Sequence, residues 1–133
     1  MITLDTQVMV FDALEPRRLS RRAKQALAEG TESRSLACSD ICLWEMAMLA
    51  ARGKIDARGD TAAFMNDLLQ ARYIRTLPIT PEIAVLAQSD AFHTLRHGDP
   101  ADRLVAATAL EYGVPLVTAD AELRKLRQLK VVW

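Results

Sequence analysis

The sequence has no long hydrophobic run, because its longest stretch without a charged residue covers only eight positions, residues 112–119. A transmembrane helix needs about 20 predominantly apolar residues, so the sequence excludes one. The N-terminal segment MITLDTQVMVFD contains two acidic residues and no basic ones, which is not the pattern of a secretory signal. We therefore expect a soluble, cytoplasmic protein with no membrane association.

Neither sign of charge is in excess, because 17 basic residues balance 17 acidic ones. Net charge therefore neither indicates nor excludes a nucleic-acid partner, which would have to contact a local basic patch. Apolar residues make up 50% of the chain and charged residues 26%, which is typical of a globular protein and not of a disordered one. The 133 residues fit one domain, expected to span residues 1–133.

Glycine and cysteine are also scarce. The glycines lie at the expected ends of secondary structure, at positions 30, 53, 59, 98 and 113. They form neither G-x-G-x-x-G nor G-K-[ST], so the dinucleotide-binding and P-loop classes lose their main support. A zinc site needs about four ligands, so Cys38 and Cys42 alone are a weak metal signal. We interpret them as small buried residues in a reducing compartment.

Short apolar runs alternate with helical patterns along the chain. The expected strands cover residues 2–4, 35–38, 73–77, 115–118 and 131–133. The expected helices cover residues 19–28, a segment from the N-cap Ser39 to about Arg52, a segment from the N-cap Asp60 to Arg72, a helix beginning at Thr80 and Pro81, a helix from Asp99 and Pro100 to Gly113, and a short helix after Asp120. Residues 5–18 are interpreted as a connection. This alternation predicts right-handed crossovers and a mostly parallel sheet covered on both faces.

Four acidic residues are placed where such a sheet would bring them together. Asp5 comes directly after the first strand, and Asp120 follows the strand at 115–118. Glu45 lies in the helix after the second strand, with a side chain that leans back toward the helix N-terminus. Asp102 lies in the first turn of its own helix. Ligands of parallel sheets bind beyond the carboxyl ends of the strands, so we expect these four carboxylates at one edge.

Converging carboxylates favour a bound cation. Two of them about 5 Å apart repel by roughly 3 kcal/mol at an effective dielectric constant near 20. Such a group either traps a proton or recruits a hard divalent ion, and all-oxygen ligation favours Mg²⁺ or Mn²⁺ over zinc. An ion of this kind can hold a phosphate, activate water and stabilise a leaving oxygen, which is what phosphodiester hydrolysis requires.

Each acid also has a purely structural interpretation. Asp99 is most simply an N-cap, Asp102 could favour the positive end of the helix dipole, and Asp120 could cap the helix that follows it. Glu45 and Asp5 are harder to explain in this way, because apolar neighbours surround both in the sequence. Taken together, the spacing of the acids favours a site.

Three segments carry a family resemblance: ITLDTQV, SDICLWEMAMLAARGKI and GDPADRLVAATALEYGVPLVTAD. They resemble the PIN-domain ribonucleases, specifically the VapC-like toxins of bacterial type II toxin–antitoxin pairs, over nearly the whole chain. The resemblance implies a three-layer α/β/α sandwich and a Mg²⁺- or Mn²⁺-dependent endoribonuclease. It implies partners as well: a small antitoxin that blocks the site, a second copy of the chain in a homodimer, and structured RNA. The catalytic, metal-binding residues that it implies are Asp5, Glu45, Asp102 and Asp120, with Thr118 as an accessory polar residue.

The chain departs from the family pattern at two places. Gln7 stands where relatives often carry a histidine. This difference changes the surroundings of the site but replaces none of the expected ligands. Some PIN domains place a further acid shortly after the last one. Glu122 is the nearest candidate here, and we expect it not to be a ligand.

Other polar and apolar patterns are less specific. His93 and His97 are four apart but lack the glutamate of H-E-x-x-H, so we expect surface positions. The segment RRLSRRAK is either the solvated face of a helix or an RNA contact; the candidates are Arg17, Arg18, Arg21 and Arg22. The basic residues within 124–130 form a second candidate patch for RNA contacts. Trp44 and the methionines beside it indicate a core stripe, or an apolar groove for an antitoxin.

Two alternatives to the nuclease interpretation remain open. A haloacid-dehalogenase-like phosphohydrolase also places an aspartate after the first strand, but it requires D-x-D and this chain has DTQ. A catalytically silent protein- or RNA-binding module on the same fold is the other. It would have no reason to maintain four mutually repelling acids.

Overall fold

The structure is a computed structural model that describes residues 1–95 and 99–133. Within these residues the strands are β1 (Ile2–Leu4), β2 (Leu36–Ser39), β3 (Arg75–Leu77), β4 (Leu116–Val117) and β5 (Val131–Val132). The α-helices are α1 (Thr6–Leu14), α2 (Arg21–Glu32), α3 (Ile41–Ala51), α4 (Thr61–Ala71), α5 (Pro81–Ala87), α6 (Pro100–Glu111) and α7 (Ala121–Arg124). Two short 3₁₀ helices, η1 (Pro16–Arg18) and η2 (Asp90–Phe92), follow α1 and α5.

The strands form one parallel sheet in the order β3-β2-β1-β4-β5. In the central strand β1, Thr3 is in register with Ala37 on one side and with Leu116 on the other. Strand residues such as Leu36, Ala37 and Val117 are fully buried, as expected when helices cover both faces of a parallel sheet. The predicted α/β class with its parallel sheet is confirmed.

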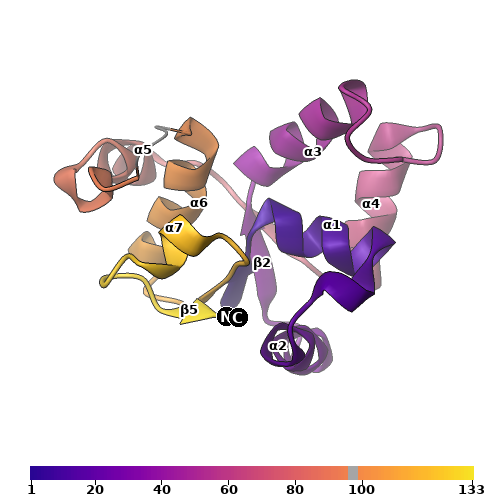
Figure 1. Cartoon of the computed structure of the whole chain (residues 1–133), viewed down its shortest axis with the longest axis horizontal. Helices are drawn as coiled ribbons and strands as arrows, with labels where there is room; N and C mark the ends of the chain where they lie inside the picture. The colour runs from indigo at the N-terminus through magenta and orange to yellow at the C-terminus, as the bar shows by residue number, and fades with distance from the viewer. Residues whose placement is uncertain (96–98) are drawn as a thin grey trace.

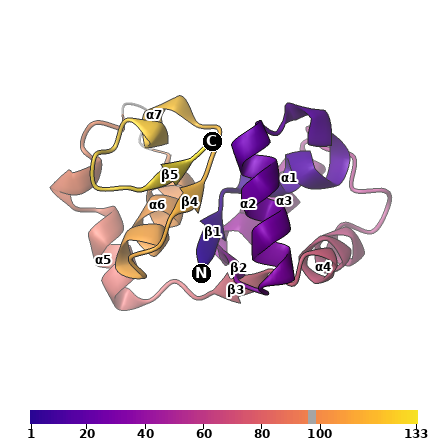
Figure 2. The ribbon, with the colours of Figure 1, turned by 90° about the horizontal axis from the view of Figure 1, so that it is seen from below.

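Helices cover the two faces of the sheet in separate groups. In Figure 1, α1 to α4 lie on one side of β2, whereas α5, α6 and α7 lie on the other. Figure 2 shows the strands between these two groups. The chain steps from β1 to β3 in one direction and then returns to β4 beyond β1, and right-handed crossovers in opposite directions place helices on opposite faces. The order reverses between β1 and β4, which is where parallel sheets form a ligand crevice.

Local capping chemistry sets where several helices begin. The side chain of the residue before each helix accepts a hydrogen bond from a backbone N–H of the first turn. The donor–acceptor distances are 3.1 Å for Ser20 in α2, 3.0 Å for Asp60 in α4, 3.2 Å for Thr80 in α5 and 3.0 Å for Asp99 in α6. The predicted starts at Asp60, at Thr80 with Pro81 and at Asp99 with Pro100 are confirmed.

The helix α1 is the main element that the sequence did not predict, because residues 5–18 were interpreted as a connection. Five of its nine residues are buried, including Val8, Met9 and Phe11. A helix buried on most of its surface has no polar face, so its sequence lacks the 3.6-residue alternation of a surface helix. Its β-branched residues also have low intrinsic helix propensity.

Two further boundaries differ from the prediction. Ser39 is the last residue of β2, and Asp40 is the N-cap of α3, so the prediction that Ser39 caps this helix is wrong. The parallel ladder extends through the pair Ser39 and Leu77, which holds Ser39 in the extended conformation. The helix expected at 19–28 instead runs from Arg21 to Glu32, because Ser20 caps it.

Gly30 lies within α2 and not at the end of an element, so its prediction as a boundary is wrong. A Cβ atom at Gly30 would come within 2.2 Å of Leu36 Cδ2, and Leu36 is fully buried in β2. The glycine therefore allows α2 to approach the sheet closely. Gly98 lies outside the described residues.

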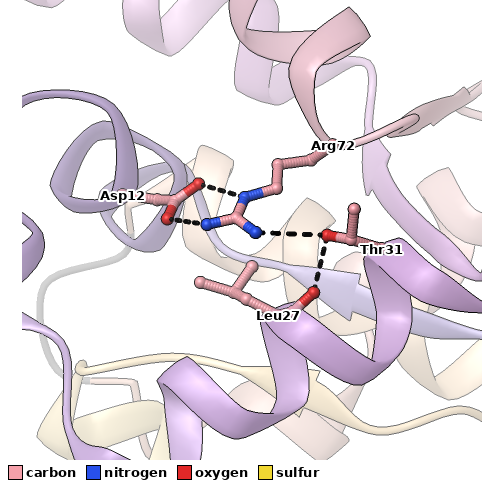
Figure 3. Close-up of polar contacts among 4 residues, drawn as sticks. All are labelled: Asp12, Leu27, Thr31 and Arg72. Atoms are coloured by element: carbon pink, nitrogen blue, oxygen red, sulfur yellow. Dashed lines mark hydrogen bonds and ion pairs between the residues drawn. The ribbon is translucent and has the colours of Figure 1, made fainter.

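An ion pair connects two helices that follow different strands. Arg72, at the end of α4, donates from Nε and Nη2 to the two carboxylate oxygens of Asp12 in α1, at 2.9 and 2.8 Å. Its Nη1 also donates to the hydroxyl of Thr31 in α2, and this hydroxyl donates to the carbonyl of Leu27 (Figure 3). The contacts hold α1 against α2 and α4. No helix in the described part of the chain is both long and apolar enough to cross a membrane.

Candidate active site

Asp5 is a buried carboxylate at the junction of β1 and α1. It is 5% exposed and is the N-cap residue of α1. The Thr118 hydroxyl donates a hydrogen bond of 2.6 Å to its Oδ2. Burial raises the pKa of Asp5, and repulsion from Asp120 raises it further, whereas the Thr118 hydrogen bond opposes the shift. Asp5 is thus a carboxylate that favours either a proton or a nearby cation.

Glu45 reaches the same region from α3, the helix that follows β2. The Thr6 hydroxyl, in the first turn of α1, donates a hydrogen bond of 2.6 Å to Glu45 Oε1. Burial raises the pKa of Glu45, and repulsion from Asp5 and Asp99 adds to the shift. The two threonines therefore act alike, since each orients one acid through a short hydroxyl–carboxylate bond.

Asp102 is the acid whose pKa is raised by all the other carboxylates of the cluster. It lies in the first turn of α6, which begins at the carboxyl edge of the sheet. Burial is the main cause that raises the pKa of Asp102 to about 7. Repulsion from neighbouring carboxylates raises the pKa further, in the order Asp99, Asp5, Asp120 and Glu45. Asp102 is consequently the electrostatic centre of the cluster.

Asp120 has both a capping role and a place in the cluster. Its Oδ1 accepts hydrogen bonds from the backbone N–H groups of Glu122 and Leu123, at 2.8 and 2.9 Å, and so caps α7. Its own backbone N–H donates to the Thr118 hydroxyl at 3.0 Å. The capping interpretation of Asp120 is confirmed. The same residue also borders the cavity that the other acids line.

Asp99 and Glu122 are placed differently. Asp99 caps α6, as expected, yet its carboxylate also approaches those of Glu45 and Asp102, so that one oxygen from each lies within 4.8 Å of the others. Glu122 does not line the cavity, and its carboxylate pairs with Lys125 at 3.1 Å.

One cavity of about 320 Å³ collects the four acids that the sequence singled out, Asp5, Glu45, Asp102 and Asp120. It extends between α1 and α3, where apolar side chains of Val10, Phe11, Leu49 and Ile55 line it. The acids come from four separate segments, and their donor atoms are all carboxylate oxygens. This donor set fits a hard divalent cation such as Mg²⁺ or Mn²⁺, which would relieve the repulsion that raises the pKa values of Asp5, Glu45 and Asp102.

Comparison with known proteins assigns the chain to a family. The family model of the PIN domain matches residues 2–129. The chain belongs to the PIN-domain family. It is 38% identical to ribonuclease VapC22 of Mycobacterium tuberculosis over 134 aligned residues, which cover 99% of this chain and 98% of that protein. The resemblance to VapC-like PIN domains is therefore confirmed, and the haloacid-dehalogenase-like alternative is removed.

Solved structures with the same fold include VapBC2 from Rickettsia felis bound to a DNA fragment from its promoter. This PIN domain superposes on it with a TM-score of 0.72 at 17% identity, covering 98% of this chain and 97% of that one. A toxin–antitoxin complex from Klebsiella pneumoniae gives a TM-score of 0.63 at 20% identity, covering 100% and 97%. The predicted three-layer α/β/α sandwich is thus confirmed.

The four arginines of the predicted basic segment differ in which cavity they line. Arg18, at the end of η1, lines the acidic cavity, whereas Arg22 lines a separate cavity beside Met1 and Ser33. Arg17 and Arg21 are exposed and line neither cavity. RNA contacts by these four arginines stay a prediction; of the four, Arg18 lines the acidic cavity, and Arg17 pairs with the same Glu15 as Arg18 does.

Three polar residues at the site were not singled out from the sequence: Thr6, Lys54 and Glu15, which lines the cavity beside its partner Arg18. Thr6 was not singled out, although a hydroxyl next to a conspicuous aspartate was a usable signal. Lys54, which lines the cavity from the segment between α3 and α4, was also not singled out. Nothing in the sequence indicated its position, because it depends on how the chain turns after α3.

The remaining motifs lie outside the acidic cavity. Cys38 and Cys42 are free and fully buried, which confirms their interpretation as small core residues. His93 is exposed, as expected, and His97 lies outside the described residues. Trp44 is 57% exposed and borders a second, apolar cavity of about 530 Å³ with Met48 and Pro100, directly beside Glu45 and Asp99. Trp44 is therefore a surface residue and not part of the core.

Proposed function

We propose that this PIN domain is a metal-dependent endoribonuclease toxin that hydrolyses RNA phosphodiester bonds. The observation that carries the proposal is the convergence of Asp5, Glu45, Asp102 and Asp120 on one cavity. The 38% identity to ribonuclease VapC22 over nearly the full length of both chains supports the same activity.

The four acids would hold Mg²⁺ or Mn²⁺, with Thr118 and Thr6 orienting Asp5 and Glu45 through their hydroxyl hydrogen bonds. A bound divalent ion supplies Lewis acidity, which lowers the pKa of water and offsets negative charge on the phosphate. In the hydrolysis, a water oxygen attaches to phosphorus and one RNA oxygen leaves as a hydroxyl. A carboxylate that is not fully engaged accepts the proton of the water. Because Asp5 is buried and hydrogen bonds already hold the carboxylates of Asp5, Glu45 and Asp120, these groups need little reorganisation.

The expected partners are an antitoxin, a second copy of the chain and structured RNA. The complex from Klebsiella pneumoniae is a toxin–antitoxin assembly of the same fold, which supports the first. The apolar cavity at Trp44 lies next to the acids and offers a surface on which an antitoxin would also cover the site. The homodimer is supported by exposed apolar residues on α5, such as the 73% exposed Val85. We infer one PIN domain over residues 1–133, acting in the cytoplasm.

The proposal is tested by incubating purified protein with total cellular RNA in Mg²⁺, in Mn²⁺ and in EDTA. We expect cleavage only with a divalent ion, and loss of cleavage in Asp5→Asn and Asp102→Asn variants that keep the wild-type circular dichroism spectrum. Asp67→Asn, on an exposed part of α4, is the matched control and should cut like wild type. Cleavage by Asp5→Asn at the wild-type rate would contradict its role. A folded wild type that neither cuts RNA nor binds Mg²⁺ or Mn²⁺ in calorimetry would instead indicate the catalytically silent module.

A further inference from the structure

Two basic residues also line the acidic cavity, and neither has a role in holding a metal ion. Arg18 and Lys54 line the same cavity as Asp5 and Asp102, but they come from η1 and from the segment after α3. The acids lie at the start of α1, whereas Arg18 follows its end. Nine helical residues rise about 12 Å. The cavity is therefore a groove along α1 with the four acids at one end and Arg18 at the other, where Glu15 pairs with it; Lys54 also lines this groove.

The Arg18 guanidinium is held in place by the floor of the groove. Its carbon Cζ lies 4.1 Å from the centroid of the Phe11 ring, and Phe11 is 6% exposed. Nη1 of Arg18 lies 3.8 Å from Glu15 Oε1, while the side chain stays 52% exposed. Stacking on an aromatic ring orients the planar guanidinium without using up its N–H donors. Glu15 lines the same cavity and offsets part of this charge, and the remaining N–H donors are available to an anion in the groove.

Lys54 is placed by the turn that ends α3. The backbone N–H of Gly53 donates to the Ala50 carbonyl at 3.1 Å, and that of Lys54 donates to the Leu49 carbonyl at 2.8 Å. Gly53 has a φ of +66°, so these bonds form a Schellman motif, which fixes the backbone at Lys54. Among residues 1–95 and 99–133, Lys54 forms no ion pair within 4.0 Å. Within the described residues, the charge of its ammonium group is therefore not neutralised by an ion pair in the lining of the groove.

Between the two ends the groove is mostly apolar, with Val10, Phe11, Leu49 and Ile55 along it. A single RNA strand has a similar pattern of charged and apolar groups, because its charged phosphates are separated by riboses and by bases with apolar faces. With one phosphate at the carboxylate end, where a divalent ion would offset the repulsion, a phosphate further along the same strand would meet Arg18 and Lys54.

We propose that Arg18 and Lys54 form a phosphate-binding subsite that holds the RNA strand next to the bond to be cut. The subsite rests on the proposed nuclease function for its purpose, but its ligand class follows from its own chemistry. Arg18 binds as an oriented fork and Lys54 as a mobile point charge. Both are positioning residues, since neither reaches the carboxylates that hold the ion.

The test measures RNA binding apart from cleavage. A fluorescein-labelled single-stranded RNA is titrated in Ca²⁺ and in EDTA with wild type, Arg18→Gln, Lys54→Gln and Arg52→Gln, followed by fluorescence anisotropy. We expect Kd to rise roughly three- to tenfold for Arg18→Gln and for Lys54→Gln. The slope of log Kd against log salt should fall by about 0.7 for each lost phosphate contact. Arg52→Gln, an exposed residue of the same turn that does not line the groove, should leave both quantities unchanged.

Several results would overturn the subsite. One is wild-type affinity and salt slope in both Arg18→Gln and Lys54→Gln. Another is an equal loss in Lys24→Gln, an exposed residue of α2 that does not line the groove, because that would indicate a diffuse surface attraction. Inorganic polyphosphate should displace the RNA more effectively than polyglutamate at equal charge. Equal displacement by polyglutamate would assign the groove to an acidic protein segment instead.

The design also separates this inference from the nuclease proposal. If the wild type cuts RNA, the two variants should raise KM with kcat within about twofold, as expected for uniform binding. If the wild type does not cut but Arg18→Gln and Lys54→Gln still weaken RNA binding, hydrolysis is refuted and the subsite stands. Cleavage by wild type with no change of Kd or KM in either variant refutes the subsite alone.

Discussion

The Thr118 hydroxyl lies 2.6 Å from Asp5 Oδ2, although 113 positions separate the two residues in the chain. The contact joins the ends of β1 and β4, the two neighbouring strands between which the strand order reverses. The same hydroxyl accepts the backbone N–H of Asp120 at 3.0 Å. One side chain thus connects two of the acids at the crevice, so Thr118 fixes the distance between them.

Replacing Thr118 by valine should weaken the site more than the fold. The Asp5 carboxylate would lose a hydrogen bond in a buried place, which costs about 1–3 kcal/mol. The pKa of Asp5 should rise further, because the Thr118 bond now opposes the effect of burial. We expect weaker Mg²⁺ binding in calorimetry and a lower rate of RNA cleavage.

Thr108→Val is the matched control for Thr118→Val. Thr108 is equally buried, but its hydroxyl donates to the Leu104 carbonyl within α6. The Thr108→Val variant should have a lower or unchanged free energy of unfolding. In either case it should bind Mg²⁺ like wild type. Equal loss of Mg²⁺ affinity in both variants would refute a specific role of Thr118.

The stability of the metal-free protein should decrease as pH rises. The pKa of Asp102 is about 7 in the folded chain and near 3.9 in an unfolded one, so the folded state binds its proton more tightly. Deprotonation between about pH 4 and pH 7 therefore costs folding free energy, and the pKa values of Asp5 and Glu45 are raised in the same direction. Thermal unfolding followed by circular dichroism in EDTA should give a melting temperature that falls from pH 5 to pH 7.5.

Two additions make this pH measurement specific. Asp102→Asn should flatten the decrease, whereas Asp67→Asn on α4 should not. Mg²⁺ should raise the melting temperature most at pH 8, where the carboxylates are charged, and least at pH 5. A wild-type melting temperature that rises between pH 5 and pH 7.5 in EDTA would contradict the raised pKa values.

Gly30→Ala should destabilise the fold although alanine is the better helix former. The new Cβ would meet Leu36 Cδ2 at 2.2 Å, and such overpacking of a core costs about 1–3 kcal/mol. The measurement is urea unfolding followed by circular dichroism. The double variant Gly30→Ala with Leu36→Ala should be less destabilised than the sum of the two single changes. Strict additivity would show that the close approach of α2 to β2 does not matter.

The ion pair between Asp12 and Arg72 should contribute about 1–2 kcal/mol to stability, because it is bidentate and partly buried. A double-mutant cycle with Asp12→Asn and Arg72→Gln in urea measures the coupling. The pair lies away from the acidic cavity, so RNA cleavage by the folded single variants should match wild type. A coupling near zero would mean that packing alone holds α1 against α4.

The sequence by itself determined much of the fold and the candidate acids. Strand and helix periodicity, with caps such as Asp60 and Thr80, placed most elements, because these signals act within a few residues. The parallel arrangement then followed from the alternation of strands and helices. Since parallel strands end at one edge, the positions of Asp5 and Asp120 after two strands were enough to predict that they lie together.

The tertiary structure alone decided what depends on packing between distant segments. The helix α1 was missed because burial on most of its surface removed the pattern that marks a surface helix. The bond from Thr6 to Glu45, the close approach of Gly30 to Leu36 and the cavity that Arg18 and Lys54 both line each involve residues from different elements. No local propensity encodes such pairs, because the distance between two elements is set by the whole core that packs between them.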